Sequence, residues 1–244
     1  MSKKPTLILS SIILIVILAV SGFFAYQKNL LTPLFKGGSG GISSNPSDIV
    51  LTPETLLSSF QNKNPNLTAQ QFQLFQQRFN ETKEILQKEP DLFDSWLYLG
   101  ILKKGVGDYE GARDVFIYAG QLRPGSSPPF ANLADIYTYF LNEPQKAEEA
   151  IKQAIANDPG DYSFYISLAD IYRYKFPDRQ GMYEQTMLEA LAKFPDNVNL
   201  IAPLAAYFRD TDQIQKAIEW YEKLVILSPA NQMAKDDLAE LRQK

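Results

Sequence analysis

Apolar residues in the larger, C-terminal part of the chain recur at helical spacing, in segments that each end at a proline. These prolines are separated by 34, 35, 36 and 34 residues, and they are Pro90, Pro124, Pro159, Pro195 and Pro229. A proline ends a helix because its ring clashes with the preceding turn and it has no N–H to donate. A regular period in this range is the signature of a repeated structural unit. The pattern therefore predicts an array of helical repeats.

Each block between two prolines contains two amphipathic stretches with matching positions. In the first stretch a large residue is followed by Leu at +3 and a small residue at +4, all on one helix face. These residues are Trp96, Phe130, Tyr165 and Ile201; Leu99, Leu133, Leu168 and Leu204; and Gly100, Ala134, Ala169 and Ala205. The second stretch aligns Ala112, Ala147 and Ala217; Phe116, Ile151, Met187 and Tyr221; and Ala119, Ala154, Ala190 and Leu224. Each block thus predicts two helices that pack large side chains against small ones.

The motif W-x2-L-G, followed by A-x3-F and a closing Pro at a 34-residue period, resembles the tetratricopeptide repeat. Residues 93–126 match it most fully, although Lys103 stands where the family has a Tyr. Residues 127–161 carry one extra residue, residues 162–197 carry two, and residues 198–231 return to 34. The resemblance implies an all-α fold, a right-handed α-solenoid of helix pairs. It also implies a concave groove that holds a protein or peptide partner.

Both ends of the predicted array need a cover, because a stack of repeats leaves an apolar face open at each end. Residues 67–92 predict a long helix after Thr68, which we interpret as an N-terminal helix or half-repeat. Residues 230–243 predict a capping helix that covers the fourth repeat with Met233, Leu238 and Leu241. Together these segments complete a tetratricopeptide-like domain over residues 67–244.

The N-terminus carries an uncharged apolar run from Thr6 to Tyr26. As a helix, this run spans about 31 Å, close to the hydrocarbon thickness of a bilayer. Residues 1–28 therefore predict a signal-anchor or transmembrane helix, preceding the all-α repeat domain. A cleaved signal peptide is an alternative, because two lysines precede the run and Ala19-Val20-Ser21 resembles a cleavage site. A buried core helix is a further alternative.

Residues 29–66 are rich in Gly, Ser, Pro and Asn, and they predict a flexible linker with a short helix after Thr52. The numbers of positive charges on the two sides of the apolar run are nearly equal, so they do not decide its orientation in the membrane. The predicted orientation rests on the short basic N-terminus, which resembles an export signal. We expect a single-pass protein of the cell membrane with an extracytoplasmic repeat domain. A cytoplasmic-facing membrane adaptor is the alternative.

The chain has no His and no Cys, and this excludes several chemistries. An imidazole base, a thiol nucleophile, a disulfide and a His/Cys zinc site are all impossible. Residues 90–244 hold 16 basic and 23 acidic residues, which disfavours nucleic acid as a partner. We expect no catalytic residue, no cofactor and no metal site, and therefore no enzyme. The alternative is a carboxylate-dependent envelope hydrolase that uses Asp135 and Asp170.

The first helices of the second and third repeats carry polar and aromatic residues opposite the core. Positions +5 and +9 from the leading aromatic residue point about 140° and 180° away from it. The resulting ligand-groove candidates are Asp135, Tyr139, Asp170, Arg173 and Tyr174, with Arg173 expected at the rim. Through the family resemblance, they suit an extended or helical segment with apolar and basic groups. Alternatively, they support the N-terminal helix folded into the groove.

These observations predict a membrane-anchored scaffold or adaptor that mediates protein–protein interaction. The partner binds in the concave groove, and the N-terminal helix holds the protein on the membrane. By resemblance to other proteins with one N-terminal span and an exported repeat domain, we expect a role in cell-envelope assembly or secretion.

Overall fold

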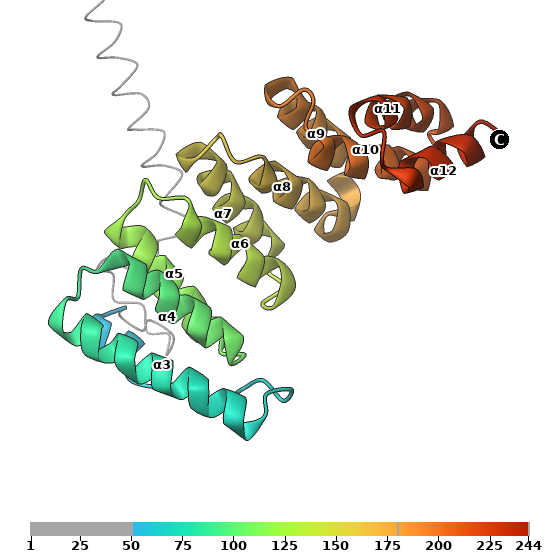
Figure 1. Cartoon of the computed structure of the whole chain (residues 1–244). Helices are drawn as coiled ribbons and strands as arrows, with labels where there is room; N and C mark the ends of the chain where they lie inside the picture. Colours follow the sequence, from blue (N-terminus) through green and yellow to red (C-terminus); the bar gives the residue numbers. More distant parts are fainter. Residues whose placement is uncertain (1–50, 180, 244) are drawn as a thin grey trace, which may run out of the picture. The chain divides into compact units, whose positions relative to one another are not determined.

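The structure is a computed structural model, and it describes residues 51–179 and 181–243. Every regular element in these ranges is helical (Figure 1). The elements are α2 (Pro53–Leu56), α3 (Ala69–Lys88), α4 (Phe93–Gly105), α5 (Tyr109–Leu122), α6 (Pro128–Tyr139), α7 (Pro144–Asn157), α8 (Tyr162–Lys175), η1 (Pro177–Arg179), α9 (Gly181–Lys193), α10 (Val198–Asp210), α11 (Ile214–Leu227) and α12 (Gln232–Leu241). The predicted all-α architecture of paired helices is confirmed, whereas the right-handed superhelical path stays a prediction.

The predicted transmembrane helix lies outside the described residues, as does the predicted linker up to residue 50. Between residues 51 and 243, the helices that the structure describes include none with the length and apolar content needed to cross a bilayer. The chain divides into two compact units, and we treat each by itself. The N-terminal unit ends at Gly125, and the C-terminal unit begins at Ser126.

Several helices begin where the side chain of the preceding residue caps the first turn. The Thr68 hydroxyl oxygen accepts a hydrogen bond from the Gln71 N–H, and Gln71 Oε1 accepts one from the Thr68 N–H. Helix α3 therefore starts with a capping box. At α10 and α12 a single cap is present, where Asn197 accepts from the Asn199 N–H and Asn231 accepts from the Ala234 N–H. Such caps satisfy N–H groups that have no partner inside the helix.

In the N-terminal unit, α4 and α5 pack through a direct contact between a small and a large residue. The Trp96 side chain is fully buried and donates a hydrogen bond from Nε1 to the Pro90 carbonyl at 2.7 Å. Gly100 faces Phe116 so closely that a Cβ on Gly100 would lie 2.5 Å from the Phe116 ring. The two helix axes can therefore approach only because this position has no side chain.

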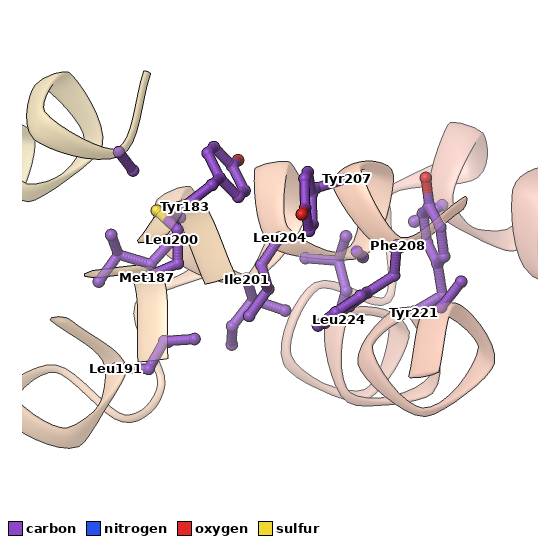
Figure 2. Close-up of a cluster of buried hydrophobic side chains, with 14 of the residues drawn as sticks. Tyr183, Met187, Leu191, Leu200, Ile201, Leu204, Tyr207, Phe208, Tyr221 and Leu224 are labelled. Atoms are coloured by element: carbon purple, nitrogen blue, oxygen red, sulfur yellow. The ribbon is translucent and has the colours of Figure 1, made fainter. Parts of the chain in front are cut away.

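A large cluster of buried apolar side chains in the C-terminal unit runs from α8 to α12, and Figure 2 shows part of it. Helix α9 contributes Tyr183, Met187 and Leu191, which face Leu200, Ile201 and Leu204 of α10 (Figure 2). On α12, Leu238 and Leu241 are buried as the sequence predicts, but Met233 is 76% exposed and Ala234 is buried in its place. The reason is helical phase, because Ala234 lies four residues before Leu238 on the same face.

Residues 51–66, which we call the strap, pack against α3, α4 and α5. Leu56 and Leu57 are 5% and 4% exposed and join the core of the N-terminal unit. Phe60 stacks on Phe79 of α3, with ring centroids 4.4 Å apart and an angle of 11° between the rings. The predicted flexible linker over 29–66 is therefore wrong for this part. The few apolar residues of the strap hold it against the helices, despite the polar composition that suggested flexibility. The predicted helix after Thr52 is present as α2.

Lys103 attaches the strap to α4 and thereby accounts for the departure from the repeat motif. The Lys103 side chain is 4% exposed, and Nζ donates to the Ser59 carbonyl at 2.9 Å and lies 3.4 Å from Asp108 Oδ2. Lys63 of the strap contacts Asp108 Oδ1 at 2.6 Å. Burial alone would raise the pKa of Asp108, but the two ammonium groups outweigh it and hold this pKa below its ordinary value.

The turn between α4 and α5 is shaped to accept the strap. Gly107 has φ of +79°, a conformation that favours glycine. A Cβ at this position would also lie 2.9 Å from the Asn64 backbone nitrogen, so the strap backbone needs the space. The Lys63 N–H donates to the Val106 carbonyl at 2.8 Å beside it.

We predict that Gly100→Leu destabilises the protein by about 1–3 kcal/mol, because the added side chain must displace the Phe116 ring. The control is Gly181→Leu, since a Cβ at Gly181 meets no atom within 4 Å. That variant should change the free energy of unfolding by less than about 0.5 kcal/mol. Urea unfolding followed by circular dichroism measures both, and equal midpoints for the two variants would contradict the packing described here.

We predict that Asp108→Asn destabilises the N-terminal unit by about 3–5 kcal/mol at neutral pH, because it leaves the Lys103 ammonium buried without its carboxylate. The control Glu110→Gln removes a weaker, exposed contact of Lys63 at 3.7 Å and should cost less than about 0.5 kcal/mol.

The same carboxylate predicts a pH dependence. Because the folded-state pKa of Asp108 is lowered, its stabilisation is present above the unfolded-state pKa of about 3.9 and is lost as the pH falls through the folded-state value. Urea midpoints across this acid range should fall more steeply for the wild type than for Asp108→Asn. Parallel pH profiles would contradict this role of Asp108.

Candidate functional site

The residues predicted to line the groove come from α6 and α8 of the C-terminal unit. Asp135 and Tyr139 are four residues apart on α6, and Asp170 and Tyr174 are four residues apart on α8, so each pair shares a helix face. Tyr139 and Tyr174 are 64% and 65% exposed, whereas both carboxylates are half-buried. Each of the two helices therefore presents a solvent-exposed tyrosine ring next to a half-buried carboxylate.

The electrostatics of Tyr139 show that these residues share one environment. Partial burial raises the pKa of the Tyr139 phenol, and the charges of Asp170 and Asp135 raise it further. A weaker contribution comes from Tyr174. A carboxylate on the neighbouring helix can act on Tyr139 only at short range. The structure therefore brings Asp135, Tyr139, Asp170 and Tyr174 near one another, and their role as a ligand groove stays a prediction.

A pocket of about 250 Å³ lies between α6, α7 and α8. Its walls combine small, apolar and polar side chains, which are Ala131, Ala134, Asp135, Thr138, Tyr139, Ile151, Ser163, Phe164, Ser167 and Ile171. The Asp135 Oδ2 atom is buried. Asp135 and Tyr139 thus belong both to the predicted groove and to this pocket.

Arg173 does not stand at the rim as a separate cation, because its guanidinium bridges three helices. Its Nη2 donates to Asp210 Oδ2 of α10 at 3.1 Å. The same group lies over the rings of Tyr174, Tyr183 and Tyr207, at 5.3, 5.4 and 5.3 Å from their centroids. A planar guanidinium can stack on rings while it binds a carboxylate. Arg173 therefore joins α8 to α9 and α10.

The tyrosines and carboxylates around Arg173 perturb one another. Burial raises the pKa of the Asp170 carboxyl, and the positive charge of Arg173 offsets part of this rise. Burial and the Asp170 charge together raise the pKa of Tyr183 to about 12, although Arg173 acts in the opposite direction. The Tyr183 ring also lies 4.3 Å from the Tyr207 ring, and both rings are visible in Figure 2.

Several residues of this region are absent from the sequence prediction. Tyr183, Tyr207 and Asp210 surround Arg173, although they follow it by 10 to 37 residues. Ser163 and Ser167 line the pocket, and their spacing of four residues on α8 was the one signal that could have pointed to them. Between residues 51 and 243, the described part of the chain contains no group of three or more Asp or Glu residues placed to hold a metal ion.

Comparison with known proteins supports the fold. No family model matches the chain. Human interferon-induced protein with tetratricopeptide repeats 2 is 27% identical over 160 residues, which cover 64% of this chain and 33% of that protein. The chain thus spans about one third of the length of this curated relative.

Solved structures of tetratricopeptide-repeat proteins match the chain over a larger share of their own length than this curated relative does. YrrB, described as a tetratricopeptide protein with an unusual peptide-binding site, has a TM-score of 0.50 at 9% identity, and the match covers 66% of this chain and 81% of YrrB. MamA from Desulfovibrio magneticus RS-1 has a TM-score of 0.51 at 21% identity, over 64% of this chain and 85% of MamA. The chain therefore has a tetratricopeptide-like fold.

Proposed function

We propose that this protein is a membrane-anchored scaffold that docks a segment of a partner protein on the α6–α8 groove, which is the surface formed by Asp135, Tyr139, Asp170 and Tyr174. The observation that carries the proposal is the exposure of Tyr139 and Tyr174 on neighbouring helices, beside a pocket of about 250 Å³. Exposed tyrosines are common anchors in interfaces, because one ring offers apolar area and a hydroxyl at low entropic cost.

The exposure of these two rings supports the proposed docking surface for physical reasons. Residues that close the core of the unit, such as Tyr137 and Tyr172, are 2% and 1% exposed. Tyr139 and Tyr174 lie two positions further along the same helices and are left in solvent, so they contribute little to core packing. The peptide-binding site named for YrrB, a protein of the same fold, is consistent with such a use of the fold.

We further propose that the apolar run from Thr6 to Tyr26 anchors the chain in the cell membrane and places the repeats on its extracytoplasmic side. The length of the run and the basic N-terminus support this part of the proposal. In this position the protein serves cell-envelope assembly or secretion by holding a partner near the membrane. It binds and positions the partner, and it contributes no catalysis.

We predict that Tyr139→Ala/Tyr174→Ala abolishes capture of one set of partner proteins. The measurement is a crosslinked pull-down of the full-length protein from native membranes, with bound proteins identified by mass spectrometry. The loss of two aromatic anchors should weaken binding by about 1,000-fold, since each anchor contributes about 2 kcal/mol and each 1.4 kcal/mol or so is a factor of ten.

The matched control for this pull-down is Tyr98→Ala/Ile226→Ala, which removes two exposed apolar side chains outside the groove. It should capture the same partners as the wild type. If the tyrosine variant also keeps every partner, the docking surface lies elsewhere and the groove assignment is wrong.

We predict that deletion of residues 6–26 moves the protein from the membrane fraction to the soluble fraction, whereas the wild type resists extraction with alkaline carbonate. Protease added to intact cells should degrade the repeats of the wild type if they are extracytoplasmic. Repeats that survive external protease but are cleaved after lysis would support the cytoplasmic-facing adaptor instead.

A further inference from the structure

The pocket between α6, α7 and α8 exists because small residues face each other there. Ala131 and Ala134 of α6 stand opposite Ser163 and Ser167 of α8, and the larger Phe164 and Ile171 form the remaining sides. Short side chains on both helices cannot fill the space between two backbones. The resulting 250 Å³ is far more than the 10–15 Å³ or so that one water molecule requires.

The polar groups that line the pocket can accept hydrogen bonds. The Asp135 carboxylate stands in its wall, with Oδ2 buried. The Ser167 hydroxyl donates to the Ser163 carbonyl at 3.1 Å, so its proton is engaged and its lone pairs are left to accept. Tyr139 adds a ring face. None of the ten described residues that line the pocket is basic.

The C-terminal unit that holds this pocket is acidic overall. The Arg173 guanidinium binds Asp210 and lies over three tyrosine rings, and none of these four residues lines the pocket. From Ser126 onward the chain holds 12 basic and 18 acidic residues, so the C-terminal unit has a formal charge of −6. An incoming cation is therefore favoured both locally and at longer range.

We propose that this pocket receives an arginine side chain from the partner protein, with the guanidinium at Asp135 and against the ring of Tyr139. The inference rests on the proposed docking function and names the chemistry that the partner must present. The occupant is a polypeptide side chain because the pocket opens beside Tyr139, which also belongs to the docking surface. The guanidinium binds the carboxylate through paired N–H donors, and the methylene stem contacts Ala131, Phe164 and Ile171.

Arginine fits this pocket better than lysine for two reasons. Its guanidinium is weakly hydrated, so it loses less than an ammonium on entering a site with apolar walls. It is also planar, and it can stack on the Tyr139 ring while it donates to the carboxylate and to a serine hydroxyl. An ammonium offers neither the plane nor the paired donors.

The test begins with a random peptide library displayed on phage. The library is selected against the full-length protein in detergent micelles, and protein-free micelles remove peptides that bind detergent. The expected result is a family of peptides with one shared arginine and adjoining apolar residues. Synthetic copies are then measured by fluorescence polarisation. Replacement of the shared arginine by lysine should weaken binding by about tenfold, and replacement by uncharged citrulline should weaken it more.

Two variants of the protein probe the pocket from different sides. Asp135→Asn removes the charge and should weaken the selected peptide by at least about tenfold. Ala131→Leu fills the space while it keeps the carboxylate, and it should weaken binding similarly. Asp178→Asn, an exposed carboxylate on η1, and Ala192→Leu, an exposed position on α9, are the matched controls and should bind as the wild type does. Urea unfolding midpoints verify that each variant folds.

The outcomes separate this inference from the docking function. If selected peptides lose binding to Tyr139→Ala/Tyr174→Ala but contain no shared arginine, or bind Asp135→Asn and Ala131→Leu as tightly as the wild type, the groove docks peptides and the arginine pocket is wrong. If no selected peptide depends on the two tyrosines, both proposals are overturned. Binding that needs the tyrosines, the shared arginine and Asp135 supports both.

Discussion

The close contact of a large side chain with a very small one is the constraint on which the helix pairs depend. Phe116 lies where a Cβ of Gly100 would stand. The equivalent positions of the other repeats hold small alanines that are buried, namely Ala134, Ala169 and Ala205. Helices that approach this closely exclude water along their whole contact, and each helix buries its apolar stripe only through its neighbour. The order of large and small residues therefore dictates which helix faces meet.

The N-terminal unit shows what happens when one member of that pattern is replaced. Lys103 occupies a position where α6, α8 and α10 have Tyr137, Tyr172 and Phe208, and its side chain remains buried. A buried ammonium is stable only with acceptors, and Asp108 and the Ser59 carbonyl supply them. The acceptor from the strap makes residues 51–66 part of the folded unit. One substitution in the repeat thus couples the start of the described chain to α4 and α5.

The groove follows from the same packing rules applied to the opposite face. Core positions must be filled, whereas positions on the far side of α6 and α8 are released from that demand. Tyr139 and Tyr174 remain in solvent there, and small residues between the two helices leave a pocket. Arg173 links α8 to α9 and α10 through Asp210 and three rings. Asp135 therefore lines the pocket, whereas Arg173 joins helices.

Period, helix pairing and the residues on each helix face could be predicted from the sequence, because they depend on spacing within about 35 residues and on a 3.6-residue turn. The same local geometry predicts that Asp135 and Tyr139 share a face of α6, and that Asp170 and Tyr174 share a face of α8. The ordered strap, the burial of Lys103, the exposure of Met233, the bridging role of Arg173 and the pocket beside Ser163 and Ser167 were decided only by the tertiary structure. Each depends on distances between side chains from different helices or segments, and such distances are set by how whole elements pack.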